Sequence, residues 1–417
     1  MKVHPEDFNL IKDNLEIETV IGEYLDLRPT GITKTALCPF HTEKTPSFKV
    51  WPSTQTFKCM GCGEQGDVIN FVTKKENFKT PSEAAKFLAD KFDIPIRIMG
   101  EEEVQNYEEQ EVILANEFAL KFFKEKFFGT YEPRKYMVDR GYTKTLVSKW
   151  EIGYAPMDYT LDYSRETLEK ADLISAKGYP KFRDRIIFPI RDITGRLVGF
   201  GGRRLSKNSK YPKYVNTAET PAYKKREVLY GLSQNLKLIK KERDNDDKKY
   251  AMIVEGYTDV NLLEKADIRF AIASCGTSFT DEQAKAISRH VDYCFLFMDT
   301  DRAGEEAKSK IIKKLWQFDA DVKPIKAEHG QDPASLAIKH GPDLYSFVET
   351  QCPMQLVYDG AEGNREKKTE ECLKAIASTP NHLRRDDLLR LLEKCSKYSF
   401  KNLLGRLNKY TTRLVFK

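Results

Sequence analysis

The sequence of 417 residues lacks the patterns that mark several large classes of protein. No apolar run approaches the length needed to span a membrane, and residues 1–27 alternate charged with apolar side chains. We therefore expect neither a membrane-spanning segment nor a secretory signal. The motif G-x-x-x-x-G-K-[ST] is also absent, which excludes a P-loop motor within this sequence, so any nucleotide is a substrate and not a fuel.

Cysteine and histidine are scarce, at eight and six residues, but four of them form a pattern. Without an export signal, these cysteines favour reduced thiols and a cytoplasmic protein over a disulfide framework. Two knuckles, Cys38-Pro-Phe-His41 and Cys59-Met-Gly-Cys62, are separated by seventeen residues. This spacing lets four ligands converge on one tetrahedral Zn²⁺, and a closed shell of four protein ligands predicts a structural ion. The alternatives are a redox-active Cys-x-x-Cys and two unrelated buried pairs.

Changes in composition along the chain indicate a multidomain protein of the α/β class. Residues 6–28 have the spacing of one amphipathic helix that runs into an extended segment, and residues 184–203 predict a β-hairpin. From residue 250 onward, four apolar runs alternate with helical segments, which predicts a parallel α/β sheet. We expect a zinc-ribbon domain at 1–97, an acidic linker at 98–111, a basic α+β subdomain at 112–246, a parallel α/β domain at 247–349 and a small helical bundle at 350–417.

The positive charge of the protein is concentrated in one segment. The formal net charge is +6, and residues 176–228 hold fourteen Lys and Arg against four Asp and Glu. These cations are interleaved with tyrosine and phenylalanine, a combination that binds single-stranded nucleic acid through phosphates and stacked bases. The alternative is a solvated charged face. The candidate nucleic-acid-binding residues in this segment are Arg183, Arg185, Arg203, Lys213 and Lys225.

Carboxylates follow the apolar runs at the places where strands of a parallel sheet would end. The acids after the first, third and fourth runs are Glu255, Asp299 with Asp301, and Asp332. Because the carboxyl ends of parallel strands share one edge of a sheet, we expect these groups to meet there and to bind divalent cations, Mg²⁺ or Mn²⁺. Asp259, one helical turn after Glu255, is a secondary candidate. The alternative for each acid is a helix cap.

Three blocks in this order resemble the bacterial DnaG-type primase family. They are the knuckles at 38–62, the segment 182–220 with FRDRIIFPIRDITGRLVGFGGR and YPKYVNTAET, and the pair VEGYTDV and MDTDRAG, which is similar to a Toprim signature. The resemblance implies a zinc domain that engages template, an RNA polymerase core with a basic subdomain, a Toprim metal site and a helical subdomain. It implies that Glu255, Asp299 and Asp301 bind the catalytic metal ions, that Asp259 and Asp332 belong to the same cluster, and that Arg203, Lys213 and Lys225 face nucleotide and template.

The function implied by this resemblance is the synthesis of short RNA primers on single-stranded DNA. The substrates would be ribonucleoside triphosphates, the reaction two-metal nucleotidyl transfer, and the product an RNA–DNA hybrid. A replicative helicase or a single-strand-binding protein would be a further partner, and no membrane is expected. The alternatives are a Toprim-type nuclease and a non-catalytic zinc-ribbon accessory protein that binds single-stranded DNA.

The sequence departs from the family pattern in two places. The family usually ends its acidic cluster with Asp-Pro-Asp, whereas this chain has Asp332-Pro333-Ala334. One outer carboxylate is missing, so we expect the stoichiometry or the affinity of metal binding to differ. The chain also stops where the family usually adds a C-terminal helicase-binding domain, which leaves recruitment by the helicase open and is compatible with a mobile-element or accessory primase.

Overall fold

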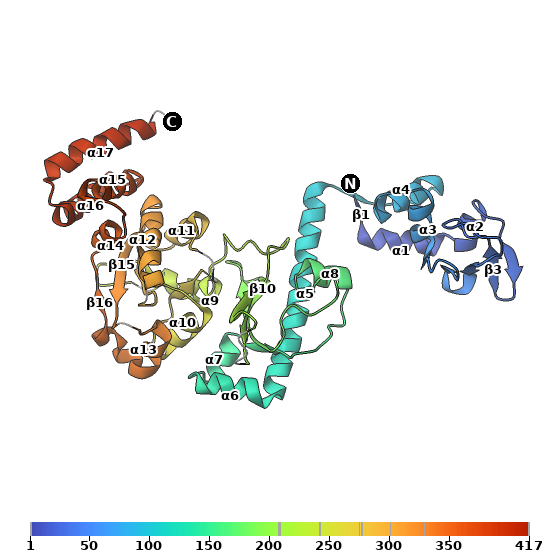
Figure 1. The fold of residues 1–417 in the computed structure, drawn as a ribbon, viewed down its shortest axis with the longest axis horizontal. Coiled ribbons are helices and arrows are strands. Elements are labelled where there is room, and N and C mark those ends of the chain that lie inside the picture. Colours follow the sequence, from blue (N-terminus) through green and yellow to red (C-terminus); the bar gives the residue numbers. More distant parts are fainter. Residues whose placement is uncertain are drawn as a thin grey trace. The chain divides into compact units, whose positions relative to one another are not determined.

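The computed structural model describes residues 2–206, 210–241, 243–274, 276, 278–300, 302–328 and 330–415. The chain divides into two compact units, Met1–Glu108 and Glu109–Lys417, and Figure 1 labels most of their helices and some of their strands. Among the described residues, no helix combines the length and the apolar character needed to cross a membrane. Asp301, one of the predicted metal ligands, lies outside the described residues.

The first unit is built on a five-stranded antiparallel sheet. Its strands, in order across the sheet, are β2 (Arg28–Thr30), β3 (Thr33–Ala36), β4 (Phe48–Trp51), β5 (Thr56–Cys59) and β6 (Gln65–Gly66). The other elements are helices α1 (Pro5–Asn14), α2 (Ile17–Gly22), α3 (Val68–Lys75) and α4 (Pro81–Lys91), and strand β1 (Lys2–Val3), which pairs with β7 (Ile98–Met99). The rings of Phe48 and Phe57 stack on each other, with centroids 5.1 Å apart, and both meet the ring of Phe71 of helix α3 at 5.7 to 5.9 Å. These rings form the core of the unit.

Two segments have secondary structure that the sequence analysis did not predict. Residues 6–28 form two helices, α1 and α2, because Leu15 and Glu16 have extended backbone between them. Residues 98–111, predicted as a linker, contain strand β7 and the first part of the long helix α5 (Glu101–Gly129). Glutamate and glutamine have good helix propensity, and acidic side chains in a first turn are stabilised by the helix macrodipole. The same acidic composition is therefore compatible with a helix as well as with a linker.

The second unit begins with a four-stranded antiparallel sheet of order β11-β10-β9-β8. These strands are β8 (Gly153–Ala155), β9 (Arg185–Arg191), β10 (Leu197–Arg204) and β11 (Tyr214–Asn216), and the helices around them are α6 (Tyr131–Asp139), α7 (Lys144–Lys149), α8 (Arg165–Lys170) and α9 (Leu232–Lys241). The hairpin predicted at 184–203 is confirmed as strands β9 and β10. Phe123 of helix α5 meets Phe200 of β10 edge to face, with centroids 5.6 Å apart. The sheet is thereby packed against helix α5.

A parallel α/β sheet follows, as predicted. Its order is β13-β12-β14-β15-β16, and only the edge strand β16 runs antiparallel to its neighbour. The strands are β12 (Tyr250–Val254), β13 (Ala271–Ala273), β14 (Tyr293–Leu296), β15 (Asp321–Lys326) and β16 (Glu349–Thr350). The connecting helices are α10 (Tyr257–Leu262), α11 (Asp281–Ser288), α12 (Arg302–Gln317) and α13 (Pro333–His340). The carboxyl ends of the four parallel strands therefore lie at one edge.

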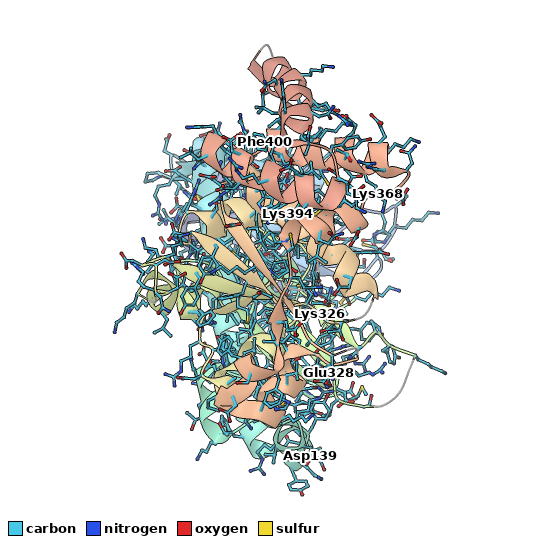
Figure 2. The ribbon with its side chains drawn as sticks, turned by 90° about the vertical axis from the view of Figure 1, so that its left-hand side faces the viewer. Asp139, Lys326, Glu328, Lys368, Lys394 and Phe400 are labelled. Atoms are coloured by element: carbon cyan, nitrogen blue, oxygen red, sulfur yellow. The ribbon has the colours of Figure 1, made fainter. Side chains whose placement is uncertain are left out.

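Four helices follow this sheet in sequence. They are α14 (Pro353–Asp359), α15 (Arg365–Ala377), α16 (His382–Ser396) and α17 (Phe400–Val415). Three of these helices contribute buried leucines to the same hydrophobic core as the parallel sheet, namely Leu373, Leu389 and Leu403. Figure 2 shows Lys368, Lys394 and Phe400 on this group of helices. The α/β fold class, with its zinc ribbon and its C-terminal helices, is confirmed.

Candidate functional site

The four predicted zinc ligands come together at one edge of the first sheet. Ala36 is paired with Phe48, which is paired with Cys59, so the chain after β3 and the end of β5 reach the same edge. The ligand atoms of Cys38, His41, Cys59 and Cys62 all lie within 4.8 Å of one another. The Sγ atoms of Cys38 and Cys62 are 3.8 Å apart, as are Sγ of Cys59 and Nδ1 of His41. Ligands about 2.3 Å from one tetrahedral Zn²⁺ are spaced in this way.

Glu43 holds these ligands in place and was not recognised from the sequence. Its Oε1 accepts hydrogen bonds from the backbone N–H groups of Cys38 (2.8 Å) and Ser47 (3.0 Å). Its Oε2 lies 3.2 Å from Nε2 of His41. A carboxylate on the second ring nitrogen fixes the tautomer and the orientation of a metal-binding histidine. The spacing of the knuckles contains no signal for such a residue.

The surroundings of Cys59 favour its thiolate. Burial raises the pKa of this thiol. Hydrogen bonds from the backbone N–H of Cys62 and from the hydroxyl of Ser47 lower it by more, so that the net pKa is about 6, below the ordinary value of a cysteine. A Cβ at position 61 would lie 2.8 Å from Nε2 of His41, so only glycine lets the knuckle pass this close to the ring. The ligand set therefore fits a structural Zn²⁺, because thiolates and imidazole are its preferred ligands.

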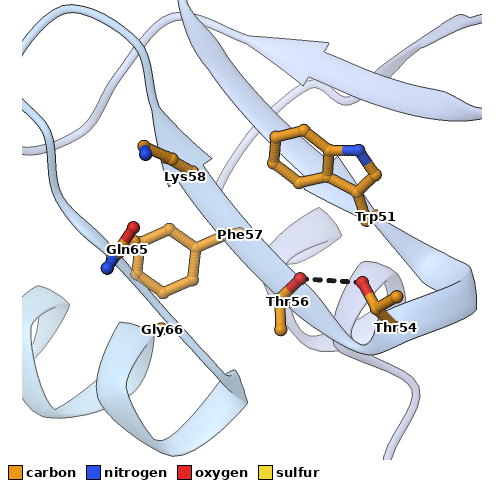
Figure 3. A pocket seen from close by; sticks show the side chains of 7 residues that line it. All are labelled: Trp51, Thr54, Thr56, Phe57, Lys58, Gln65 and Gly66. Carbon is orange, nitrogen blue, oxygen red and sulfur yellow. Dashed lines mark hydrogen bonds between the residues drawn. The ribbon is translucent and has the colours of Figure 1, made fainter.

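An open cavity of about 530 Å³ lies on the β4–β5 hairpin of the same unit. Figure 3 shows the rings of Trp51 and Phe57 and the side chain of Lys58 among its lining residues. Phe57 belongs to the core, so the aromatic face on which a base could stack is that of Trp51, beside the cation of Lys58, a combination that binds single-stranded nucleic acid. The sequence analysis did not single out these residues, because Trp51 and Lys58 lie outside the basic segment and become neighbours only across the hairpin.

The parallel sheet brings Glu255 and Asp299 together. The connection after β12 runs to β13 and the connection after β14 runs to β15, on the other side, so the two leave in opposite directions and open a crevice at the carboxyl ends of β12 and β14. Glu255 follows β12, and its Oε1 accepts a hydrogen bond from the backbone N–H of Asp299, which follows β14 (3.0 Å). A side chain at Gly304 would collide with the carbonyl oxygen of Asp299. Glycine therefore allows helix α12 to begin against this edge.

A cavity of about 750 Å³ opens at this edge. Four of the predicted carboxylates line it, namely Glu255, Asp259, Asp299 and Asp332. Asp332 also caps helix α13, since its Oδ1 accepts a hydrogen bond from the backbone N–H of Ser335 (2.7 Å). The prediction that one of these acids caps a helix is therefore confirmed for Asp332, which lines the cavity as well. Among the described residues, the zinc ligands are the one group of three or more His, Cys, Asp or Glu side chains whose ligand atoms converge as around a metal ion.

The pKa of Asp259 is raised by burial and by the negative charge in this cavity. Burial raises the pKa of its carboxyl group, the carboxylates of Asp299 and Asp332 raise it further, and the backbone N–H of Gly256 opposes them. The resulting pKa is about 7. A buried carboxyl group among other carboxylates fits a divalent cation, whose charge would offset the repulsion.

Without added Mg²⁺ or Mn²⁺, the free energy of unfolding of the second unit is expected to fall as the pH rises from about 4 to about 7. The pKa of Asp259 is about 7 in the folded chain against 3.8 for an ordinary aspartate, so the folded state binds the extra proton in this range. Asp259→Asn should remove this slope and raise the free energy of unfolding at pH 8 by about 2–4 kcal/mol. Urea unfolding at pH 5 and pH 8 measures the effect, with the exposed Asp321→Asn as the control. An unchanged slope in Asp259→Asn would contradict the expectation.

Cations of the basic segment line the same cavity. Arg203 of β10 and Lys213, next to β11, both contribute to its wall. Arg203 donates hydrogen bonds from Nε to the hydroxyl of Tyr136 (2.6 Å) and from Nη1 to the hydroxyl of Tyr214. Arg140 also lines the cavity and donates from Nε to Tyr136 (3.0 Å). The sequence analysis missed Arg140 because it lies outside residues 176–228.

Three other predicted cations lie outside this cavity. Arg185 is buried, and its Nη1 donates to the backbone carbonyl of Gly202 (3.0 Å), so it supports the sheet. Arg183 is paired with Asp158 (2.8 Å). Both arginines line a second cavity of about 310 Å³, whereas Lys225 lines neither. That Arg183, Arg185 and Lys225 bind nucleic acid is a prediction from the sequence that the structure does not test.

The carboxylate cavity also has an apolar side. Ala334, the residue at which the chain departs from the family pattern, lines it together with Ile338 and Val138. Ile338 and Val138 are exposed. The cavity therefore combines carboxylates, cations and an apolar surface, which are the kinds of group that a metal-bound nucleotide needs for its phosphates and its base.

Comparison with families of known proteins assigns three consecutive parts of the chain. Residues 3–104 match the CHC2 zinc finger, residues 122–236 match the N-terminal domain of the DNA primase catalytic core, and residues 249–326 match the Toprim domain. These ranges contain the zinc ligands, the basic strands, Glu255 and Asp299. The fold and the sites thus define a zinc-ribbon protein with a Toprim domain.

The relatives and solved structures agree with this class. The DNA primase of Halalkalibacterium halodurans is 34% identical over 94% of this chain and 68% of its own length, and that of Aquifex aeolicus is 33% identical over 88% and 73%. The crystal structure of the zinc-binding and RNA polymerase domains of Aquifex aeolicus primase matches 96% of this chain and 99% of its own, with 31% identity and a TM-score of 0.60. A DnaG catalytic domain bound to single-stranded DNA matches 69% of this chain and 99% of its own, with 25% identity and a TM-score of 0.60. The chain belongs to the DnaG-type DNA primase family, which confirms the resemblance seen in its sequence.

Proposed function

We propose that this protein is a DNA-directed RNA polymerase that makes short RNA primers on single-stranded DNA. The observation that carries the proposal is that the carboxylates of the parallel sheet and the cations of the basic sheet line one cavity. Similarity to DNA primases over 94% of the chain favours primer synthesis over the nuclease and the accessory-protein alternatives. The reaction would join a 3′-hydroxyl oxygen to the α-phosphorus of a ribonucleoside triphosphate and release pyrophosphate.

In this proposal the carboxylates hold the catalytic cations and the basic residues hold phosphates. Glu255 and Asp299 would bind Mg²⁺ or Mn²⁺, as the sequence predicts also for Asp301, with Asp259 and Asp332 lining the same cavity. A bound divalent cation supplies positive charge for the attacking hydroxyl and for the leaving pyrophosphate. Arg203 and Lys213 would neutralise phosphates of the nucleotide and of the template, for which their place in the cavity is the support.

Template binding is proposed for both units. The DnaG catalytic domain that matches this chain was solved with single-stranded DNA. In the second unit, the residues that fit a strand are Arg203 and Lys213 in the carboxylate cavity. In the first unit, the cavity with Trp51 and Lys58 offers an aromatic face and a cation. Zn²⁺ would fold this surface and take no part in the chemistry.

The direct test is primer synthesis by the full chain. Single-stranded DNA, four ribonucleoside triphosphates and Mg²⁺ or Mn²⁺ should yield labelled RNA strands, and omission of template or addition of EDTA should abolish them. Labelled DNA incubated without nucleotides should remain intact. Lack of product with either metal ion would contradict the proposal, and degradation of the DNA would favour a nuclease.

Lys213→Gln is expected to weaken binding of single-stranded DNA and to flatten its dependence on salt. Each phosphate contact to a single strand contributes about 0.7 to the slope of log affinity against log salt concentration, through counterion release. Fluorescence anisotropy without added Mg²⁺ or Mn²⁺, between about 50 and 200 mM salt, measures this slope. Lys323→Gln is the control, because it removes the same charge from a lysine that does not line the cavity. Lys323 lies on strand β15, over the ring of Tyr293 and 3.8 Å from its centroid. Equal slopes for wild type and Lys213→Gln would remove Lys213 from the binding surface.

A further inference from the structure

Tyr257 connects the carboxylate edge of the parallel sheet to the basic antiparallel sheet. It lies between Glu255 and Asp259 in the sequence and is the first residue of helix α10. Its ring is 3% exposed and stacks on Phe188 of strand β9, with centroids 5.1 Å apart and planes at 14°. It also meets Tyr230 edge to face at 4.7 Å. A residue of the acidic edge is therefore packed against the sheet that carries the cations.

The register of the basic sheet explains where the hydroxyl of Tyr257 lies. Gly201 of β10 is paired with Asn216 of β11. A Cβ at position 201 would lie 2.6 Å from the hydroxyl oxygen of Tyr257, so the ring fits here only because position 201 has no side chain. From this place the hydroxyl donates a hydrogen bond to Oδ1 of Asn216 (2.9 Å). Tyr257 and Asn216 both line the carboxylate cavity.

This hydrogen bond joins the two sides of the cavity. Asn216 is the last residue of β11, two positions after Tyr214, whose hydroxyl accepts a hydrogen bond from Arg203. Tyr257 is two positions after Glu255. The strand that supports the cation Arg203 is thus tied directly to the helix that follows the carboxylate, across 41 residues of sequence.

We propose that Tyr257 and Asn216 form a positioning pair that sets the separation between the cations of strands β10 and β11 and the carboxylates at the ends of β12 and β14. The inference rests on the proposed function, in which one nucleotide contacts both groups. This hydrogen bond is partly buried, and hydrogen bonds are directional and hold their partners within a narrow range of distances. A displacement of about 1 Å in a reacting geometry can slow a reaction by about a hundredfold. The pair should therefore affect the rate of nucleotide transfer more than the affinity for substrates.

Tyr257→Phe tests the pair, because it keeps the stacked ring and removes only the hydroxyl. We expect kcat for ribonucleotide incorporation to fall about five- to twentyfold, with KM for the nucleotide and Kd for template, measured without added Mg²⁺ or Mn²⁺, within about twofold of wild type. Asn216→Ala should lower kcat as well, and the double variant should be no slower than Asn216→Ala alone, because both changes remove the same bond.

Tyr230→Phe is a matched control. Its hydroxyl donates an equivalent hydrogen bond to Oδ1 of Asn261 (3.0 Å), in the same aromatic core but outside the lining of the cavity. This variant should lose as much thermal stability as Tyr257→Phe and keep kcat within about twofold of wild type. The proposal is overturned if Tyr257→Phe and Tyr230→Phe have equal kcat, or if template affinity falls as much as kcat. A wild-type chain that makes no primers contradicts the proposed function itself, whereas an active wild type with an equally active Tyr257→Phe contradicts the positioning pair alone.

Discussion

Glu255→Gln is expected to lower the rate of primer synthesis by about a thousandfold or more, the equivalent of about 4 kcal/mol in the activation barrier. Glutamine has nearly the same shape, and its amide oxygen can still accept the hydrogen bond that Glu255 accepts from the backbone N–H of Asp299 (3.0 Å). The fold should therefore be retained. What is lost is one negative charge in the cavity where the proposed cations bind, and neutral amides are poor ligands for Mg²⁺.

The measurement is incorporation of labelled ribonucleotide at saturating template, with thermal unfolding as a check on the fold. Asp321→Asn is the matched control, because Asp321 begins strand β15 and so lies at the opposite edge of the same sheet. It should retain activity within about twofold, since it has no place in the cavity. A Glu255→Gln variant with more than about a tenth of the wild-type rate would remove Glu255 from the metal-binding group.

Removal of zinc from the full chain is expected to unfold the ribbon of the first unit and to leave the second unit folded. Structural zinc contributes about 10–16 kcal/mol of apparent binding free energy in small zinc domains, which exceeds what so small a core can supply. The second unit has its own hydrophobic core, which contains none of the ribbon residues. Hydrogen exchange should therefore show loss of protection in strands β3, β4 and β5, with β12 and β14 still protected.

Cys59→Ala should have the same effect as chelation, because Cys59 is fully buried among the other ligands. Cys352→Ser is the control, since Cys352 is an exposed cysteine outside the zinc ligands and should leave one zinc per chain. Protection that persists in β3 to β5 after the zinc content has fallen to zero would show that the ribbon folds without its ion. Template binding by the unit, if carried by Trp51 and Lys58, should be lost together with that protection.

The parts of the protein that local spacing could predict are those in which neighbours in space are also neighbours in sequence. The zinc knuckles are Cys-x-x-His and Cys-x-x-Cys, and each half-site is complete within four residues. The hairpin of β9 and β10 is similarly local. The edge of the parallel sheet was predictable for a different reason, since parallel strands always present their carboxyl ends together, and this brings Glu255 and Asp299 side by side. The acidic stretch at 98–111 contains the boundary between the two units, but its helical conformation was not predicted, because composition alone does not separate an extended linker from the start of a charged helix.

Other features were decided only by tertiary structure. The basic segment looked like one surface in the sequence, but the alternation of side chains along β9 and β10 and the loop before β11 separate its cations, with Arg203 and Lys213 in one cavity and Arg183 and Arg185 in another. Arg140 reaches the first cavity from outside the segment.

The sequence by itself determined which ligands and charges the protein has: a Cys3His zinc site, a set of acids after apolar strands and a basic segment between them. The tertiary structure decided which of these groups face one another and what holds them there, namely Glu43 behind His41 and the hydroxyl of Tyr257 on Asn216. The physical reason is that ligand type and strand pattern follow from local chemistry and periodicity. A hydrogen bond between distant residues depends instead on strand order and register, and on the space that Gly201 leaves open.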